Sequence, residues 1–442
     1  MATMEKTNGV QNGTAHADLA KPQSQDLASF VEQIQHETKT IVNFCNENTL
    51  PLMSFSQDFP VDLAEPIQAS RARLREAARA VYDITTGPFD HLFSIAWGLH
   101  DIATLRWILH FKIPEAIPLA GNISYDDLAL KCEVSMTSLR RMLRFCMVKR
   151  LFQEPMPEQV AHSSFSSLLV TDTVLRGQLE YLCEDSFPIS TRLVEAHEKW
   201  PGSTSSNNAA FNLARNTDLQ RYAYLAQPGN EEQLRRFHNM LTFARKERAT
   251  DVKYVPRAYS WDKVNTVVDI GGGSGGVAVT LARAFPHICV IVEDQAESVA
   301  AGAKSLPPEL QDRVRLVERD FFAERLDEQD AAKKTYFLRL VLHNWPDKDV
   351  RRIIERLVPG MQAGAKLLVM DMMVPAPGTV PPAMEWWMRS LDMEMMLGFN
   401  SKVRSQQDWS ELFMNIGPGL EMKSNSTPDG SGLTIMEFGL AK

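Results

Sequence analysis

The chain has few cysteines, no long apolar run and no excess of basic residues. Its 442 residues include five cysteines, which are scattered and form no C-x-x-C pair, so we expect neither a disulfide framework nor a metal site. No stretch approaches about 18 consecutive apolar residues, which argues against a membrane-spanning helix. Acidic residues outnumber basic ones by 55 to 47, whereas a nucleic-acid-binding protein usually carries a basic stripe. We therefore expect a globular cytoplasmic protein without a nucleic-acid or membrane partner.

Composition divides the chain into a polar tail and two larger parts. Residues 1–26 are polar, lack the apolar core of a secretory signal and cannot bury enough apolar surface to fold. They are predicted to form a disordered tail. Residues 27–260 show mostly helical spacing of apolar residues, whereas residues 261–442 alternate strand-like and helical segments. The two larger parts are therefore predicted to be separate domains.

Residues 121–170 show the pattern of a winged helix. Two helical spans come first, and Leu151–Phe152 and Ser164–Val170 then resemble the strand pair of a wing. The second helical span is basic enough to face DNA, but it is also heavily apolar and the chain as a whole is acidic. A structural or dimerisation module explains the pattern better than a DNA-binding one.

The last part of the chain predicts an α/β fold. Its buried strands are expected at Val264–Ile270, Ile288–Glu293, Val314–Val317, Tyr336–Leu342 and Lys366–Val374. Helical spans lie between them, and such alternation is typical of an open, Rossmann-like, mostly parallel sheet with helices on both faces. Two further apolar segments, Leu420–Met422 and Leu433–Leu440, are expected to form an antiparallel pair at the end of the chain.

The most informative segment is the glycine-rich stretch 267–276, VVDIGGGSGG. It follows a predicted strand and opens a predicted helix. Glycines such as Gly271 and Gly273 let the backbone turn sharply and approach a ligand without a Cβ in the way. Their spacing differs from the G-x-G-x-x-G of nicotinamide sites. Asp269, two residues before the first glycine, suits a cationic ammonium group better than a pyrophosphate.

Polar and aromatic residues follow the next two strands. Asp294 lies about 20 residues past the glycine turn, where a carboxylate commonly accepts hydrogen bonds from a ribose diol. Asp320 and Phe321 follow the third strand, where an acid and an aromatic ring could bind an exocyclic amine and stack on a base. These strand ends together predict an adenosine-type ligand.

A histidine follows the fourth strand in the run 336–347, YFLRLVLHNWPD. His343 would lie at the carboxyl end of the sheet, where such folds bind their ligands, and histidine is well suited to take a proton near neutral pH. Arg339 precedes it by four residues. Asp371 ends the fifth strand and could orient the imidazole. A histidine bonded to backbone and a solvated carboxylate are the alternative interpretations.

These residues together resemble a known family. The stretches 267–276, Asp294, Asp320–Phe321, 339–346 and 400–405 are similar to those of the caffeate-type, metal-independent O-methyltransferases of plants and fungi. That family uses S-adenosylmethionine and acts on small molecules. It joins a helical dimerisation domain with a winged helix to a methyltransferase sheet, so the resemblance implies a homodimer of this architecture.

The resemblance also implies a role for each matching residue. It implies that Gly271, Asp294, Asp320, Phe321 and Arg339 contact S-adenosylmethionine. It implies further that His343 is the general base, which removes a phenol or enol proton so that the oxygen attacks the activated methyl group. Asp371 takes the first of two acidic positions that flank this base in the family.

At the second of these positions the sequence has Val403 instead of an acid. Some fungal relatives with this fold are pericyclases, which keep S-adenosylmethionine as a charged fixture and guide dehydration or cycloaddition of a polyketide-derived substrate. In that alternative, His162 and Arg339 would donate hydrogen bonds to a substrate carbonyl. His162 can equally be a residue bonded to backbone at the wing. The intact run around His343 makes methyl transfer the first hypothesis.

The acceptor pocket is expected between the helical part and the sheet. Its predicted lining is His162, Met240, Trp387, Met393 and Val403. The chain has 20 methionines, and flexible thioether side chains suit an adaptable apolar pocket. We expect an aromatic or polyketide-like acceptor of specialised metabolism.

Overall fold

The described chain divides into two compact units. The computed structural model describes residues 26–55, 65–246, 248–323 and 331–441. The first unit holds the described residues up to Ser54 and from 65 to Ala96, and the second holds Phe55 and those from Trp97 onward. The predicted disordered tail, residues 1–26, lies outside the described residues except for Asp26. The predicted domain boundary near residue 260 stays a prediction.

The first unit is built from two helices, α1 (Leu27–Glu47) and the N-terminal part of α2 (Glu65–His110). Asp26 begins α1 as its N-cap and accepts the Ser29 N–H at 2.9 Å, which satisfies one of the unpaired donors of the first turn. The guanidinium of Arg73 on α2 forms a paired hydrogen bond with the buried carboxylate of Glu37 on α1. This ion pair joins the two helices within the unit.

The second unit begins with a small helical module and a three-stranded antiparallel sheet in the order β1–β3–β2. Its elements are α3 (Ile113–Ala116), β1 (Ile123–Ser124), α4 (Tyr125–Lys131), α5 (Met136–Val148), β2 (Gln153–Met156) and β3 (Gln159–Ala161). The expected strand at Ser164–Val170 is wrong, because these residues form helix α6 (Ser164–Thr171). Ser163 and Ser166 form a capping box at its start, which fixes a helix where the apolar run alone left strand and helix open.

A helical segment links this module to the large sheet. It comprises α7 (Thr173–Tyr181), a π-helical turn (Leu182–Ser186), α8 (Phe187–Ser190), α9 (Leu193–Lys199), α10 (Ala210–Arg215), α11 (Arg221–Leu225), α12 (Glu231–Lys246) and α13 (Val255–Ala258). The π-helical turn carries Asp185, which pairs with Arg215 at 2.7 Å and Arg236 at 2.6 Å. These ion pairs hold α10 and α12 against the turn.

The large sheet has seven strands in the order β6–β5–β4–β7–β8–β10–β9. The strands are β4 (Thr266–Ile270), β5 (Cys289–Asp294), β6 (Val314–Glu318), β7 (Lys334–Arg339), β8 (Lys366–Asp371), β9 (Leu420–Ser426) and β10 (Thr434–Leu440). The first five are parallel, and β10 and β9 are antiparallel. The predicted parallel strands and the predicted antiparallel pair at the chain's end are confirmed, with shifts of up to four residues.

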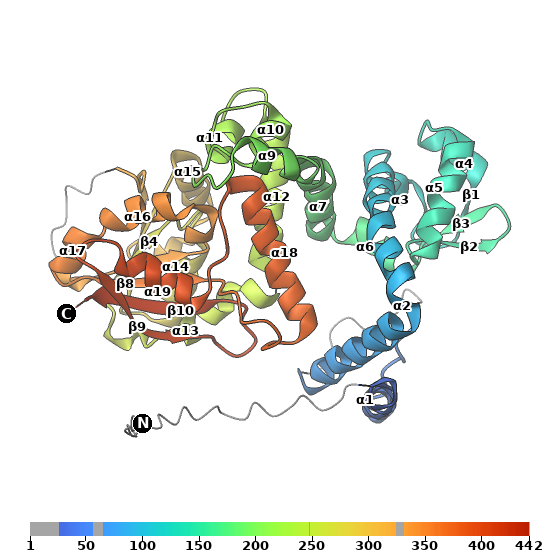
Figure 1. Ribbon diagram of the computed structural model, residues 1–442, viewed down its shortest axis with the longest axis horizontal. Coiled ribbons are helices and arrows are strands. Elements are labelled where there is room, and N and C mark those ends of the chain that lie inside the picture. The colour runs from blue at the N-terminus through green and yellow to red at the C-terminus, as the bar shows by residue number, and fades with distance from the viewer. Residues whose placement is uncertain (1–25, 56–64, 247, 324–330, 442) are drawn as a thin grey trace, which may run out of the picture. The chain divides into compact units, whose positions relative to one another are not determined.

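Helices pack on both faces of the sheet (Figure 1). They are α14 (Gly276–Ala284), α15 (Ala296–Ser305), α16 (Asp347–Glu355), α17 (Val358–Gln362), α18 (Pro382–Phe399) and α19 (Gln406–Met414). Alternate residues of β4 enter different cores: Val268 packs with residues of α16, α17 and α19, whereas Val267 packs with residues of α13 and α14. This alternation confirms the Rossmann-like α/β fold class, because successive strand residues point to opposite faces.

Strand β7 is shorter at its end than the sequence predicts. β7 ends at Arg339 rather than at Leu342, because Leu340 has a φ of 55°, which an extended strand cannot accommodate. A 3₁₀ turn over Leu342–Asn344 follows. Within the described ranges, no helix combines the length and apolar character needed to cross a membrane.

Candidate active site

The candidate site lies at the carboxyl end of the parallel strands. In the strand order, β4 lies between β5 and β7, so the direction of chain progression reverses at β4. Ligands of open α/β sheets bind beside such a reversal. The parallel pairings place Asp294, Arg339 and Asp371, which are the last residues of β5, β7 and β8, at the same edge as the glycine turn.

The glycine turn has the backbone geometry that its composition predicts. Gly271, Gly273 and Gly275 have φ values of 71°, 59° and 87°, in the left-handed region that side chains disfavour. A Cβ on Gly271 would lie 2.8 Å from Cγ2 of Val341. A Cβ on Gly272 would overlap the carboxylate of Asp269. The turn therefore packs against both the end of β4 and the loop after β7.

Asp269 has the environment expected for a ligand-binding carboxyl group. The residue is 1% exposed, and its Oδ2 atom has no hydrogen-bond partner within the described part of the chain. Burial raises its pKa to about 7; the charge of Asp294 also raises the pKa, and the Arg339 guanidinium lowers it. A buried carboxyl oxygen without a partner fits a cationic or hydrogen-bond-donating ligand.

The next two strand ends supply the predicted acids and an aromatic ring. Oδ2 of Asp294 accepts the Gly273 N–H at 2.7 Å, so this carboxylate is fixed to the glycine turn. Asp320 accepts the Phe322 N–H at 2.9 Å. The ring of Phe321 lies edge-on to Trp345 with centroids 5.6 Å apart. The structure thereby joins the end of β6 to the loop that carries His343.

His343 and Asp371 form a buried pair at the ends of β7 and β8. Nδ1 of His343 lies 2.7 Å from Oδ1 of Asp371, and the His343 backbone N–H donates to Oδ2 at 3.3 Å. Asp371 is fully buried and remains the hydrogen-bond acceptor when ionised, so Nδ1 carries the proton. That tautomer leaves Nε2 with a lone pair. No hydrogen bond to Nε2 is found among the described residues.

The Arg339 side chain extends from the end of β7 toward Thr250 and Asp269. Its Nη2 donates a hydrogen bond to the carbonyl of Thr250. Its positive charge acts on the Asp269 carboxyl. The structure therefore associates Arg339 with the first strand end, which agrees with a place at the cofactor edge of the site.

His162 lies in the core of the small module. Its residue is 1% exposed, and its two ring nitrogens lie 3.0 Å from the Ser166 hydroxyl and 3.1 Å from the Pro114 carbonyl. Burial lowers its pKa. These contacts tie the imidazole to α3 and α6.

The other predicted pocket residues do not form one group. Trp387 and Val403 pack in the same core cluster, on the face of the sheet covered by α14. Met240 belongs to a second cluster with Tyr181, Phe237 and Phe399, and Met393 is 41% exposed on α18. The apolar lining is therefore distributed over α12, α18 and the loop after α18.

Sequence reasoning missed two residues beside the His343 loop. The Ser401 hydroxyl donates to the His343 carbonyl at 2.7 Å. The ring of Tyr222 packs on Trp345 with centroids 5.9 Å apart and on Phe399 at 5.4 Å. Both contacts bridge segments far apart in the chain, and no local pattern in the sequence marks them.

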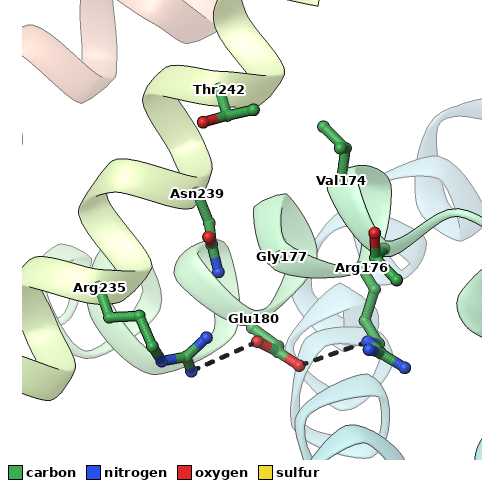
Figure 2. A pocket seen from close by; sticks show the side chains of 8 residues that line it. Val174, Arg176, Gly177, Glu180, Arg235, Asn239 and Thr242 are labelled. Atoms are coloured by element: carbon green, nitrogen blue, oxygen red, sulfur yellow. Dashed lines mark ion pairs between the residues drawn. The ribbon is translucent and has the colours of Figure 1, made fainter. Parts of the chain in front are cut away.

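A polar cavity of about 290 Å³ lies between α7 and α12 (Figure 2). Its wall includes Glu180, which lies 3.8 Å from both Arg176 and Arg235. The helices approach closely there, because a Cβ on Gly177 would lie 2.9 Å from the Cβ of Asn239. None of the predicted site residues lines this cavity.

Fold and site together define a class of protein. A Rossmann-like sheet with a glycine turn at its reversal point, a buried unpaired carboxyl group and a neighbouring histidine–aspartate pair is the arrangement of an enzyme with an adenosine-type cofactor. The family model of the O-methyltransferase domain matches residues 220–418, and that of the O-methyltransferase dimerisation domain matches residues 93–172.

Known O-methyltransferases are similar in sequence to this chain over nearly its whole length. The O-methyltransferase bik3 of Gibberella fujikuroi is 33% identical and covers 98% of this chain and 99% of its own. The O-methyltransferase pgmB of Aspergillus terreus is 32% identical, over 96% and 98%. The "Grayanic acid biosynthesis cluster O-methyltransferase" of Cladonia grayi is 29% identical, over 93% and 87%. The chain belongs to the O-methyltransferase family, which uses S-adenosylmethionine.

Solved structures share the fold at low identity. OxaC has a TM-score of 0.73 and 18% identity, covering 94% of this chain and 99% of its own. LepI in complex with SAM has a TM-score of 0.69 and 21% identity, covering 93% and 100%. Another solved structure, described as "A Pericyclic Reaction enzyme", has a TM-score of 0.69 and 22% identity. At these identities the likeness establishes the fold alone.

Proposed function

We propose that the protein methylates a phenolic or enolic oxygen of a small molecule, with S-adenosylmethionine as donor and His343 as general base. The observation that carries the proposal is the 2.7 Å contact between Nδ1 of His343 and Asp371. It fixes the tautomer whose Nε2 lone pair can accept a proton. Family membership supplies the reaction class.

The cofactor fits the residues at the strand ends. The chain would hold it with Asp269, Gly271, Gly273, Asp294, Asp320, Phe321 and Arg339. The unpaired Oδ2 of Asp269 is suited to its ammonium group, and the left-handed glycines leave room for close approach. When bound, S-adenosylmethionine supplies a methyl group that the sulfonium charge already activates.

The protein's own task is then to align the acceptor and remove one proton. Nε2 of His343 accepts the proton of the acceptor hydroxyl. Asp371 stabilises the imidazolium that forms, because its buried carboxylate stays bonded to Nδ1. Proximity and orientation supply the rest of the rate enhancement.

The acceptor is expected to be a polyketide-derived phenol or enol of fungal secondary metabolism. The relatives named above are fungal O-methyltransferases, and one is named for a biosynthesis cluster. Family membership carries this expectation rather than a formed pocket, because Met240, Trp387, Met393 and Val403 do not form one group.

We further propose that the protein acts as a cytoplasmic homodimer. Apolar side chains recur on α2 at helical spacing and are exposed: Phe89 at 70%, Leu92 at 67% and Ile95 at 65%. A contiguous exposed apolar stripe usually marks an interface. The match to the dimerisation domain begins at residue 93, within this stripe.

A pericyclase is the second candidate. Val403 stands where the family has a second acid, and its side chain is buried in an apolar cluster at 4% exposure. This position therefore offers no carboxylate to assist His343. The fold is also shared with a solved structure described as a pericyclic reaction enzyme. In this alternative, His162 and Arg339 would act on a substrate carbonyl, but the contacts of His162 with Ser166 and Pro114 favour a structural role for its ring.

The two candidates differ in what happens to the cofactor. The test incubates the protein with S-adenosylmethionine and a panel of phenols, enols and hydroxypyridone-type polyketides. Release of S-adenosylhomocysteine with a product that carries one more methyl group supports the proposal. A cyclised or dehydrated product of unchanged methyl count, without S-adenosylhomocysteine, contradicts it and supports the pericyclase.

A further inference from the structure

Arg404 lies fully buried behind the His343 loop. Its side chain is 0% exposed. Nη1 donates to the carbonyl of Leu342 at 3.0 Å, and Nη2 donates to the carbonyl of Trp345 at 2.8 Å. Nε and Nη2 both donate to Oδ1 of Asp347, at 2.9 and 2.7 Å. One guanidinium thus binds three acceptors within residues 342–347, on both sides of His343.

The remaining contacts fix Arg404 itself. Its guanidinium lies 5.0 Å from the ring centroid of Trp409 on α19, a favourable cation–π distance. Its backbone carbonyl accepts the Val374 N–H at 3.1 Å, just beyond β8. Arg404 is therefore anchored to the sheet and to α19, and it reaches the loop from a rigid base.

The loop needs such support because its backbone is irregular. Leu340 has a φ of 55°, a conformation that costs energy for a branched side chain. The 3₁₀ turn over Leu342–Asn344 leaves carbonyl groups that a longer helix would satisfy internally. Arg404 donates to the Leu342 carbonyl in this turn and to the Trp345 carbonyl just after it, through a planar, forked donor that lysine cannot imitate.

We infer that Arg404 is the positioning residue for the general base: it holds the turn that sets His343 against Asp371. Its effect on catalysis rests on the proposed function, whereas its effect on the His343 ring does not. Ser401 also supports this turn, through its hydrogen bond to the His343 carbonyl. Loss of the Arg404 fork would let the turn relax and lengthen the contact between His343 and Asp371.

The experiment compares wild type with Arg404→Lys, Asp347→Asn and Asp349→Asn. Asp349 is the matched control, because it lies on the same turn of α16 and pairs with Arg352 rather than Arg404. Each full-length protein, saturated with S-adenosylhomocysteine, is labelled with ¹⁵N-histidine, and the His343 ring signals are assigned with His343→Gln. Methyl transfer is measured beside the spectra.

We expect Arg404→Lys to shift the His343 ring signals away from the Nδ1–H tautomer and to lower kcat by about 10²-fold, since general-base catalysis contributes about that much. Asp347→Asn should act in the same direction by a smaller factor, and Asp349→Asn should match wild type. If Arg404→Lys does not fold, the difference between Asp347→Asn and Asp349→Asn decides the matter.

Unchanged His343 signals in folded Arg404→Lys would overturn the inference. So would equal effects of Asp347→Asn and Asp349→Asn. A failure of the proposed function gives a different result: His343→Gln would retain methyl transfer, while the ring signals would still respond to Arg404→Lys.

Discussion

The carboxylate of Asp371 binds His343 twice, once at ring Nδ1 and once at the backbone N–H. One fully buried acid therefore fixes both the position and the tautomer of the imidazole. Asp371 ends strand β8, whereas His343 lies in the 3₁₀ turn after β7, so the sheet supplies the acid and the turn supplies the base.

Removing the charge of Asp371 should impair methyl transfer without impairing cofactor binding. In Asp371→Asn the imidazolium formed during the reaction loses its buried counter-charge, so we expect kcat to fall by about 10²-fold. Affinity for S-adenosylhomocysteine, measured by calorimetry, should stay within about threefold. A kcat close to that of wild type would mean that Asp371 does not act through His343.

Cofactor affinity should depend on pH through Asp269. Its pKa of about 7 in the cofactor-free protein lies above the ordinary value, and a bound cation favours the carboxylate. Affinity should therefore be weak where Asp269 is protonated and rise roughly tenfold between about pH 5.5 and 7.5. Isothermal titration calorimetry with S-adenosylmethionine at several pH values in this range measures the change in affinity.

Asp269→Asn provides the control for this pH dependence. It should bind the cofactor weakly at every pH and remove the slope. The pKa of Asp269 is higher in the folded protein than in the unfolded chain, so its protonated form stabilises the fold. This stabilisation is fully present below the pKa of the unfolded chain and is lost as pH rises through about 7. The cofactor-free variant should therefore melt higher than wild type at about pH 7.5. An unaltered slope in the variant would exclude Asp269 as its source.

The glycine turn should tolerate a methyl group at one position and not at another. Gly271→Ala places a Cβ 2.8 Å from Val341 at a φ of 71°, so we expect a loss of stability of about 1–3 kcal/mol and weaker cofactor binding. Gly276→Ala has no atom within 4 Å of the new Cβ and favours helix α14. Thermal melts of both variants, with and without cofactor, test the contrast.

The fold was predictable where a pattern is local. Short apolar runs with helical segments between them predict the strands of the sheet. The glycine turn predicts the edge of the sheet at which a ligand binds. Ser164–Val170 shows the limit, because a short apolar run fits a strand and a helix equally, and the capping box at Ser163 decides between them. The sequence showed that Val403 replaces an acid of the family, but only the structure shows that its side chain packs in an apolar cluster.

The site was predictable residue by residue rather than as a network. His343, Asp371 and the strand-end acids follow from their positions after strands. Ser401, Tyr222 and Arg404 reach the His343 loop from segments more than fifty residues away in the sequence, so only the tertiary structure brings them there.

Disrupting the apolar stripe of α2 should separate the proposed dimer. Ile95→Glu places a charge on a residue that is 65% exposed in the single chain, and Val194→Glu does the same at 68% exposure on α9, outside the stripe. A buried unpaired charge at an interface is costly, so Ile95→Glu should sediment as a monomer and Val194→Glu as wild type. Identical sedimentation of both variants would place the interface elsewhere.

The role of His343 is tested most directly by S-adenosylhomocysteine release from His343→Gln and wild type, with an acceptor that the wild type methylates. The account predicts a fall of about 10²-fold or more in kcat, with cofactor affinity within about threefold of wild type. Release at the wild-type rate in the variant would contradict it, because the proton would then leave without the imidazole.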